Sequence, residues 1–229
     1  QMNHLISEVY ESKIQLQNSE MRALQAQINP HFLYNTLDAI VWLAEENKSA
    51  EVVKMVTSLS DFFRTTLSKG HDYITVKEER THIESYLEIQ QFRYQDILDY
   101  EIQMDEEIYG YIIPKLTLQP LVENALYHGI KNKRGKGKIL ITGKKQGDKI
   151  IFQVIDNGKG MTEEELNSLR KKMAGTDTGD EAKGFGISNV NQRIKYYYGE
   201  EYGVFFESKE NEGTNATIII AAKNIQLPS

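Results

Sequence analysis

The sequence contains no cysteine. Disulfide bonds, zinc sites built on thiolates and a cysteine nucleophile are therefore excluded. A long hydrophobic run is also missing, because the longest unbroken one covers only residues 39–44, far short of the ~20 apolar residues that span a bilayer. The first residues do not have the pattern of a signal peptide, and we expect none there. Because the sequence begins in the middle of a helical pattern, we expect a soluble fragment of a longer protein.

Positive charge is in the minority. Lys and Arg number 27 against 33 Asp and Glu, which gives a formal net charge of −6. A general nucleic-acid binder normally has a basic face, so we expect no nucleic-acid partner and interpret the basic residues 131–138 as a solvated loop. With 229 residues, 40% hydrophobic and 26% charged, the chain has the composition of a globular protein with one large or two small domains.

Proline and glycine are scarce in the first 95 residues, where only Pro30 and Gly70 occur. Apolar side chains recur at three- and four-residue steps over residues 5–28. This spacing predicts an amphipathic helix, either in a parallel coiled coil or packed on a globular body. A second helix is predicted over residues 50–68, and a third begins at a capping box that opens with Thr75. The front of the chain is therefore predicted to be all-helical.

The pattern changes near residue 96, which we predict as a domain boundary. Helices are predicted over residues 115–130 and 186–198. Alternating side chains predict five strands, of which the second and third form a hairpin: residues 100–104, 138–145, 149–156, 204–208 and 214–221. The predicted fold class is therefore α followed by α+β.

The helix predicted over residues 115–130 carries four candidate site residues. Glu123, Asn124, Tyr127 and His128 project from neighbouring faces, because positions three and four apart return to the same side. An amide oxygen suits Mg²⁺, which prefers hard oxygen ligands and keeps waters and phosphates in its shell. Asn124 is thus a candidate metal ligand, although a single asparagine in a helix is more often simply solvated.

A glycine-rich segment follows the strand predicted over residues 149–156. Asp156 can accept a hydrogen bond from the exocyclic amine of adenine, while Gly158 and Gly160 let the backbone approach a ligand closely. Met161 completes this candidate nucleotide-binding segment. Taken alone, such a string is more often just a tight turn.

A second glycine-rich segment opens the last predicted helix. Around Gly184 and Gly186, backbone N–H groups at a helix N-terminus would form a phosphate site. Residues 162–183 are polar and are predicted to form a mobile lid over the bound ligand. Two glycines by themselves are weak evidence for a phosphate site. The sequence closely resembles the GHKL ATPase superfamily in four features taken together: the helix with Asn124, Asp156 with its glycines, this glycine-rich segment, and Thr214 near the C-terminal end. This resemblance implies ATP as ligand and a Bergerat-type α/β sandwich.

The front half resembles one branch of that superfamily. Residues 24–37 look like the phosphoacceptor segment of the YesM/LytS-type sensor histidine kinases, and the resemblance extends over residues 20–222. It implies a homodimer in which two helical hairpins form a four-helix bundle. It also implies three parts: a signalling coiled-coil helix at residues 1–22, a dimerisation and histidine phosphotransfer domain at 23–95, and a catalytic ATP-binding domain at 96–229.

The resemblance makes His31 the acceptor of a phosphoryl group from Mg-ATP. Pro30 removes a backbone hydrogen bond, so the helix is predicted to kink there and expose His31. Neutral imidazole is a competent nucleophile near pH 7, because its unperturbed pKa is ~6.5. Asn35 either positions water for dephosphorylating the partner or has a structural role. Many relatives have an acid directly after the histidine, where this chain has Phe32, so Glu123 becomes the candidate proton acceptor or holder of a Mg-bound water.

The resemblance also implies partners and a location. The phosphoryl group would pass to an Asp of a response regulator receiver domain. The chain would continue from a membrane-spanning sensor region of the same protein, at the cytoplasmic face of the bacterial plasma membrane. Two rival interpretations are a GHKL ATPase without phosphohistidine chemistry and a nucleotide-binding dimeric scaffold without turnover. His82 has no companion at metal-ligand spacing and is predicted to face solvent.

Overall fold

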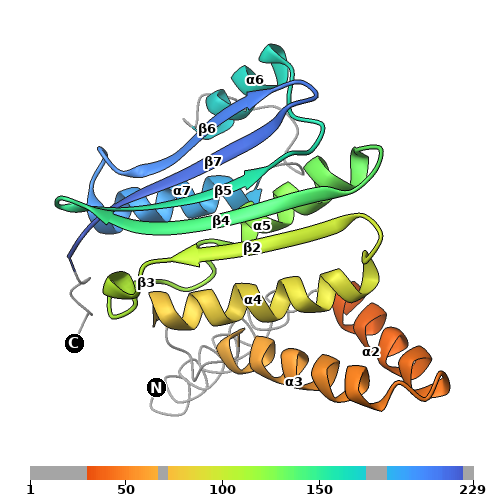
Figure 1. Cartoon of the computed structure of the whole chain (residues 1–229). Coiled ribbons are helices and arrows are strands. Elements are labelled where there is room, and N and C mark those ends of the chain that lie inside the picture. Colours follow the sequence, from red (N-terminus) through yellow and green to blue (C-terminus); the bar gives the residue numbers. More distant parts are fainter. Residues whose placement is uncertain (1–29, 67–71, 174–184, 224–229) are drawn as a thin grey trace, which may run out of the picture.

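A computed structural model describes residues 30–66, 72–173 and 185–223 of the chain (Figure 1). The predicted coiled-coil helix at residues 1–22, the residues before Pro30 that a kink would involve and the end of the helix predicted over residues 50–68 lie outside these residues. Within the three described stretches, no helix combines the length and the apolar character needed to cross a bilayer. The described chain consists of a helical part followed by a mixed α/β part, as predicted.

Three helices form the first part. Helices α2 (Pro30–Glu45) and α3 (Ser49–Thr66) make a hairpin that packs beside α4 (Val76–Arg93) (Figure 1). α4 begins at the predicted capping box. The Thr75 hydroxyl accepts a hydrogen bond from the Glu78 amide at 3.2 Å, and the Glu78 carboxylate accepts one from the Thr75 amide at 2.7 Å. These reciprocal bonds satisfy donors that a helix N-terminus otherwise leaves open.

Aromatic side chains join the three helices. The ring centroid of Phe32 on α2 lies 4.9 Å from that of Phe62 on α3 and 5.5 Å from that of Tyr86 on α4. All three side chains are buried. Each such ring pair stabilises the fold by roughly 0.5–1.5 kcal/mol beyond the area that it buries. α2 is therefore anchored through the residue that directly follows His31.

The second part is built on a five-stranded sheet with strand order β2-β4-β5-β7-β6. β2 pairs in parallel with β4, and the other neighbours pair antiparallel. All five strands were predicted, as was the β4–β5 hairpin: β2 (Leu98–Met104), β4 (Gly137–Gln146), β5 (Lys149–Asp156), β6 (Gly203–Lys209) and β7 (Gly213–Ala221). A separate pair, β1 (Tyr73–Thr75) and β3 (Ile112–Pro114), was not predicted, because such short strands show no alternating pattern.

Helices cover one face of the sheet. α5 (Gln119–Asn124), α6 (Glu163–Met173) and α7 (Phe185–Tyr198) lie together on that face (Figure 1). The strands alternate accordingly, since Ile141 and Val154 are buried while their neighbours Thr142 and Gln153 are only half-buried. A sheet with one helical layer is the α/β sandwich that the GHKL resemblance implies.

The helix predicted over residues 115–130 starts later and is irregular. Leu116 has a φ of 57°, which lies in the left-handed region and interrupts a right-handed helix. α5 therefore begins only at Gln119. It continues as a π-helical turn, Ala125–Gly129, and a 3₁₀ turn, Ile130–Asn132.

No helix was predicted within residues 162–183, yet α6 occupies their first half. Its start is a second capping box. The Thr162 hydroxyl accepts from the Glu165 amide at 3.2 Å, and the Glu165 carboxylate accepts from the Thr162 amide at 2.9 Å. A threonine followed three residues later by a glutamate is the signal in the sequence that could have revealed this helix. Residues 174–184 lie outside the described part.

Candidate nucleotide site

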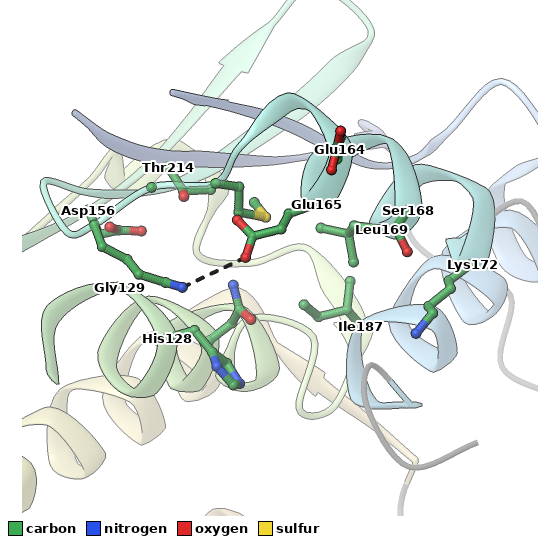
Figure 2. Close-up of a pocket in the computed structure, with 14 residues that line it drawn as sticks. His128, Gly129, Asp156, Glu164, Glu165, Ser168, Leu169, Lys172, Ile187 and Thr214 are labelled. Atoms are coloured by element: carbon green, nitrogen blue, oxygen red, sulfur yellow. Dashed lines mark ion pairs between the residues drawn. The ribbon is translucent and has the colours of Figure 1, made fainter. Parts of the chain in front are cut away.

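A cavity of about 490 Å³ opens between the helical layer and the ends of β5 and β7 (Figure 2). This volume lies within the usual range for sites that bind small molecules and cofactors. Helix α5 with its π-helical turn, the segment after β5, α6, α7 and β7 all contribute to its wall. The lining residues are Asn124, His128, Gly129, Asp156, Lys159, Gly160, Met161, Glu164, Glu165, Ser168, Leu169, Lys172, Ile187 and Thr214.

Asp156 is the buried polar group of this cavity. It ends β5, pairs across the sheet with Thr214 and is only 5% exposed. Its Oδ1 accepts a hydrogen bond from the Gly158 amide at 2.8 Å. Burial raises the pKa of Asp156 from 3.8 to about 6, although hydrogen bonds from the Gly158 and Thr214 backbone oppose this shift. An ionised carboxylate retains further acceptor capacity, so Asp156 suits a ligand that donates N–H groups.

Two glycines are required by the backbone around Asp156. A Cβ on Gly158 would lie 2.4 Å from the carbonyl carbon of Gly129. Gly160 has a φ of 64°, and a Cβ there would lie 2.0 Å from the Lys209 carbonyl oxygen. No side chain fits at these distances. Gly158 therefore allows the π-helical turn to approach the segment after β5, and Gly160 allows the end of β6 to approach it.

The structure brings most of the predicted nucleotide-binding residues to one place. Six of them line the cavity although they come from separate segments: Asn124, His128, Asp156, Gly160, Met161 and Thr214. Figure 2 shows His128 on one wall, with Asp156 and Thr214 beyond it. The Gly158 amide donates a hydrogen bond to Asp156, and Gly186 directly precedes the lining residue Ile187. Gly184 lies outside the described residues.

Tyr127 and Glu123 are not among the lining residues. The Tyr127 hydroxyl accepts a hydrogen bond from Gln90 of α4 at 3.1 Å, and the Lys131 ammonium sits 5.2 Å from its ring centroid. Glu123 accepts a hydrogen bond from Gln119 at 2.9 Å, and burial raises its pKa. Both side chains belong to the packing between α5 and α4. The proton-acceptor role of Glu123 stays a prediction, and this position does not support it.

The sequence analysis expected residues 162–183 to cover the ligand, but it did not predict that a helix, α6, forms a wall of the cavity. Glu164, Ser168 and Leu169 of α6 line the cavity, and Lys172 does so one turn further on (Figure 2). The Lys159 ammonium lies 3.9 Å from the Glu165 carboxylate and ties the segment after β5 to this helix. Both partners are largely exposed, so the ion pair contributes little stability. α6 closes the cavity with a surface of mixed polarity.

His31 lies outside the cavity. It is exposed in the first described turn of α2. Asn35, one turn later, donates a hydrogen bond to the His31 carbonyl oxygen. Asn35 also borders a small space lined by Phe32, Gln90 and other residues of α2, α3 and α4. Asn35 therefore contacts the backbone of α2 in this structure, and both alternatives that the sequence analysis gave for it stay predictions.

The prediction that His82 faces solvent is wrong. His82 on α4 is fully buried, and its ring stacks on Phe62 with a centroid distance of 4.6 Å. Its Nε2 lies 2.6 Å from the Gln119 side-chain oxygen. The error arises because α4 is covered both by α3 and by the segment leading into α5, so more than one face of the helix is buried. Helical periodicity alone cannot show this.

The donor set of the cavity fits a magnesium nucleotide. Among the described residues, no group of three His, Asp or Glu side chains could hold a metal by itself. Mg²⁺ usually takes only one or two protein ligands and fills its shell with water and substrate phosphates. Asn124 lines the cavity and offers an amide oxygen of this kind. Lys159 and Lys172 also line the cavity and add positive charge to it.

Two family models match the chain. The model described as "Histidine kinase" matches residues 19–98. The model described as "Histidine kinase-, DNA gyrase B-, and HSP90-like ATPase" matches residues 114–224, which implies that this part binds ATP. The sandwich is also similar to the nucleotide-free catalytic domain of the histidine kinase ThkA. That similarity has a TM-score of 0.50 at 19% identity and covers 67% of this chain and 97% of that one, so it supports the fold alone.

Two similar curated proteins are named as sensors. The chain is 38% identical to "Sensor histidine kinase YesM" of Bacillus subtilis over 97% of its length, but spans only 37% of that protein. It is 32% identical to "Sensor protein LytS" of Bacillus anthracis over 91% of its length and spans 35% of that protein. With one model matching the helical part and the other matching the sandwich, the chain belongs to the histidine kinase family.

Proposed function

We propose that this chain is the kinase portion of a two-component sensor and transfers the γ-phosphoryl group of ATP to His31. The observation that supports this most directly is the presence, in one chain, of an exposed His31 and a cavity built around the buried Asp156. A nucleotide-clamping ATPase or a passive scaffold does not require an exposed histidine at position 31.

The proposed site holds ATP at both ends. Asp156 accepts a hydrogen bond from the adenine amine, and the glycines beside it leave room for the base. At the other end, the backbone N–H groups of the first turn of α7, around Gly186, bind phosphate oxygens. Asn124 supplies an amide oxygen for Mg²⁺, which neutralises charge on the phosphate oxygens when it is bound.

His31 acts as the nucleophile. A lone pair on one imidazole nitrogen attacks the γ-phosphorus, an N–P bond forms, the bond to the bridging oxygen breaks and ADP leaves. Neutral imidazole carries this lone pair at pH 7. Because His31 does not line the cavity, transfer requires the ATP-binding part to move relative to α2, within one subunit or between two. We assign signal transmission to residues 1–22, phosphotransfer to 23–95 and ATP binding to 96–229.

A homodimer accounts for the exposed apolar residues of the hairpin. Large apolar side chains are 44–67% exposed on α2 and α3: Tyr34, Leu37, Val41, Trp42, Val53 and Val56. Apolar side chains gathered on one helical hairpin mark an interaction surface. A second copy, packed as a four-helix bundle, would cover them. Replacing Trp42 with Glu should reduce the mass measured by light scattering toward that of a monomer. The control Tyr196→Glu, on the exposed face of α7, should leave the mass unchanged.

The remaining parts of the proposal concern the whole protein. The matched sensor kinases are longer than this chain. We therefore place a membrane-spanning sensor region elsewhere in the full-length protein and this portion at the cytoplasmic face of the bacterial plasma membrane. An Asp of a response regulator receiver domain would accept the phosphoryl group from His31. Profiling transfer from the phosphorylated chain to candidate receiver domains tests this partner, and transfer to none of them would contradict it.

Labelled ATP separates the proposal from its rivals. With γ-labelled ATP, a histidine kinase retains a label that is stable in base and lost in acid, and with α-labelled ATP it retains none. An ATPase without phosphohistidine chemistry releases labelled phosphate and leaves the chain unlabelled. A scaffold binds ATP and does neither. Either of the last two outcomes would overturn the kinase assignment.

A further inference from the structure

His82 lies between the hairpin of α2 and α3, which carries His31, and helix α5, which lines the nucleotide site. One face of its ring stacks on Phe62 of α3, with planes inclined by 18°. Phe62 in turn packs against Phe32, the neighbour of His31 in α2. The ring of His82 is therefore held in place by the core of the helical hairpin.

The edge of the same ring contacts α5. His82 Nε2 lies 2.6 Å from Gln119 Oε1, and Gln119 Nε2 donates to Glu123 at 2.9 Å. Because the Gln119 amide nitrogen is directed to the Glu123 carboxylate, its oxygen must face His82 and accept. His82 Nε2 therefore carries the proton, and the direction of the whole chain of hydrogen bonds is fixed.

α5 depends on contacts of this kind. It has 6 residues, too few for a helix to hold its own geometry in water. One turn before His82 on α4, the buried Glu79 carboxylate accepts hydrogen bonds from the Leu116 amide at 3.0 Å and the Leu118 amide at 2.7 Å. These bonds secure the segment in which Leu116 adopts its left-handed conformation. α4 thus holds the start of α5, and Asn124 is the last residue of that helix.

We propose that His82 is a positioning residue for the nucleotide site. Through Gln119 and Glu123 it fixes the rotation of α5, and with it the direction in which Asn124 presents its amide to the phosphates. His82 does not touch the nucleotide. The proposal rests on the proposed role of Asn124 in ATP binding.

Two substitutions separate the hydrogen bond from the ring packing. His82→Phe keeps a ring to stack on Phe62 but removes the donor. His82→Gln loses the ring but places an amide donor where Nε2 stood. We expect His82→Phe to weaken ATP affinity about tenfold, because the half-buried Gln119 oxygen loses its partner and α5 is no longer held in one rotation. His82→Gln should bind ATP within about twofold of the wild type, as one restored hydrogen bond predicts.

Ser58→Ala provides a matched control. The Ser58 hydroxyl of α3 donates to the Glu88 carboxylate of α4 at 2.5 Å. Ser58→Ala removes a largely buried polar contact between the hairpin and α4, but this contact has no connection to α5. Its melting temperature should fall while its ATP affinity stays at the wild-type value. A merely structural role for His82 would give the same result for His82→Phe.

The measurement is the dissociation constant for ATP with saturating Mg²⁺, determined by calorimetry on folded protein and accompanied by a thermal melt of each variant. Wild-type affinity in His82→Phe would overturn the proposal, as would equal weakening in His82→Phe and His82→Gln. If His82→Phe does not fold, Gln119→Leu replaces it, and wild-type ATP affinity in that variant would also overturn the proposal. Failure of the kinase assignment would appear separately, as absence of phosphohistidine in the wild type.

Discussion

Adenosine affinity should depend on pH through Asp156. Burial raises the pKa of this carboxyl group from 3.8 to about 6. About one tenth of the Asp156 side chains are then ionised at pH 5 and about nine tenths at pH 7. The ionised form is the stronger acceptor for the adenine amine. The dissociation constant for adenosine should therefore fall by up to about tenfold between pH 5 and pH 7.

Adenosine is the appropriate probe because phosphate groups themselves titrate in this range, with a second pKa near ~6. Titration by NMR or fluorescence at several pH values gives the profile for the wild type and for Asp156→Asn. The variant should bind adenosine more weakly at pH 7 and show a flat profile, since its amide does not titrate. A pH-dependent profile of the same shape in both proteins would refute the assignment of Asp156.

The raised pKa of Asp156 also makes the free energy of unfolding depend on pH. A carboxyl group whose folded pKa is raised stabilises the folded state below its unfolded pKa, and this contribution is lost as pH rises through the folded pKa. For Asp156 the window runs from 3.8 to about 6, which corresponds to a loss of about 3 kcal/mol in the free energy of unfolding. Asp156→Asn does not lose this stability as the pH rises, because its amide does not titrate. The difference in unfolding free energy, variant minus wild type, should therefore increase between pH 4 and pH 7 in urea titrations.

Further substitutions test the glycines and the helical core. Gly158→Ala should lose ATP binding and lower the melting temperature, because the new Cβ would lie 2.4 Å from the Gly129 backbone. Gly186→Ala should melt no lower than the wild type, since among the described residues its Cβ would meet only Pro120, at 3.4 Å. It should bind ATP more weakly because the new methyl group lies where phosphates approach the backbone, and unchanged ATP affinity would contradict that. Phe32→Glu should reduce the unfolding free energy by about 3 kcal/mol or more, as urea denaturation would measure, and a stable variant would contradict the anchoring role of Phe32.

Local patterns predicted those parts of the site that depend on local geometry. Asp156 with Gly158 and Gly160 could be identified because a strand end followed by glycines has the same backbone requirements wherever it occurs. The capping box at Thr75 is likewise set by four consecutive residues. In both cases the energy that fixes the structure lies within one short segment, so the sequence contains the whole signal.

Features that depend on contacts between distant segments were missed. His82 and Gln119 lie 37 positions apart, and no periodicity in α4 shows that the segment before α5 covers it. Nor does the sequence show that the Glu123 side chain accepts a hydrogen bond from Gln119 and does not line the cavity; its role as a proton acceptor stays a prediction. Tertiary packing determines where the side chains of His82 and Glu123 lie.

The central claim is that His31 receives the γ-phosphoryl group of ATP bound in the cavity around Asp156. The most direct test measures base-stable, acid-labile labelling from γ-labelled ATP in the wild type and in His31→Gln, with ATP affinity determined for both proteins. The account predicts labelling of the wild type alone and equal ATP affinities. Base-stable, acid-labile label retained by His31→Gln would show that another residue accepts the phosphoryl group and would contradict the account.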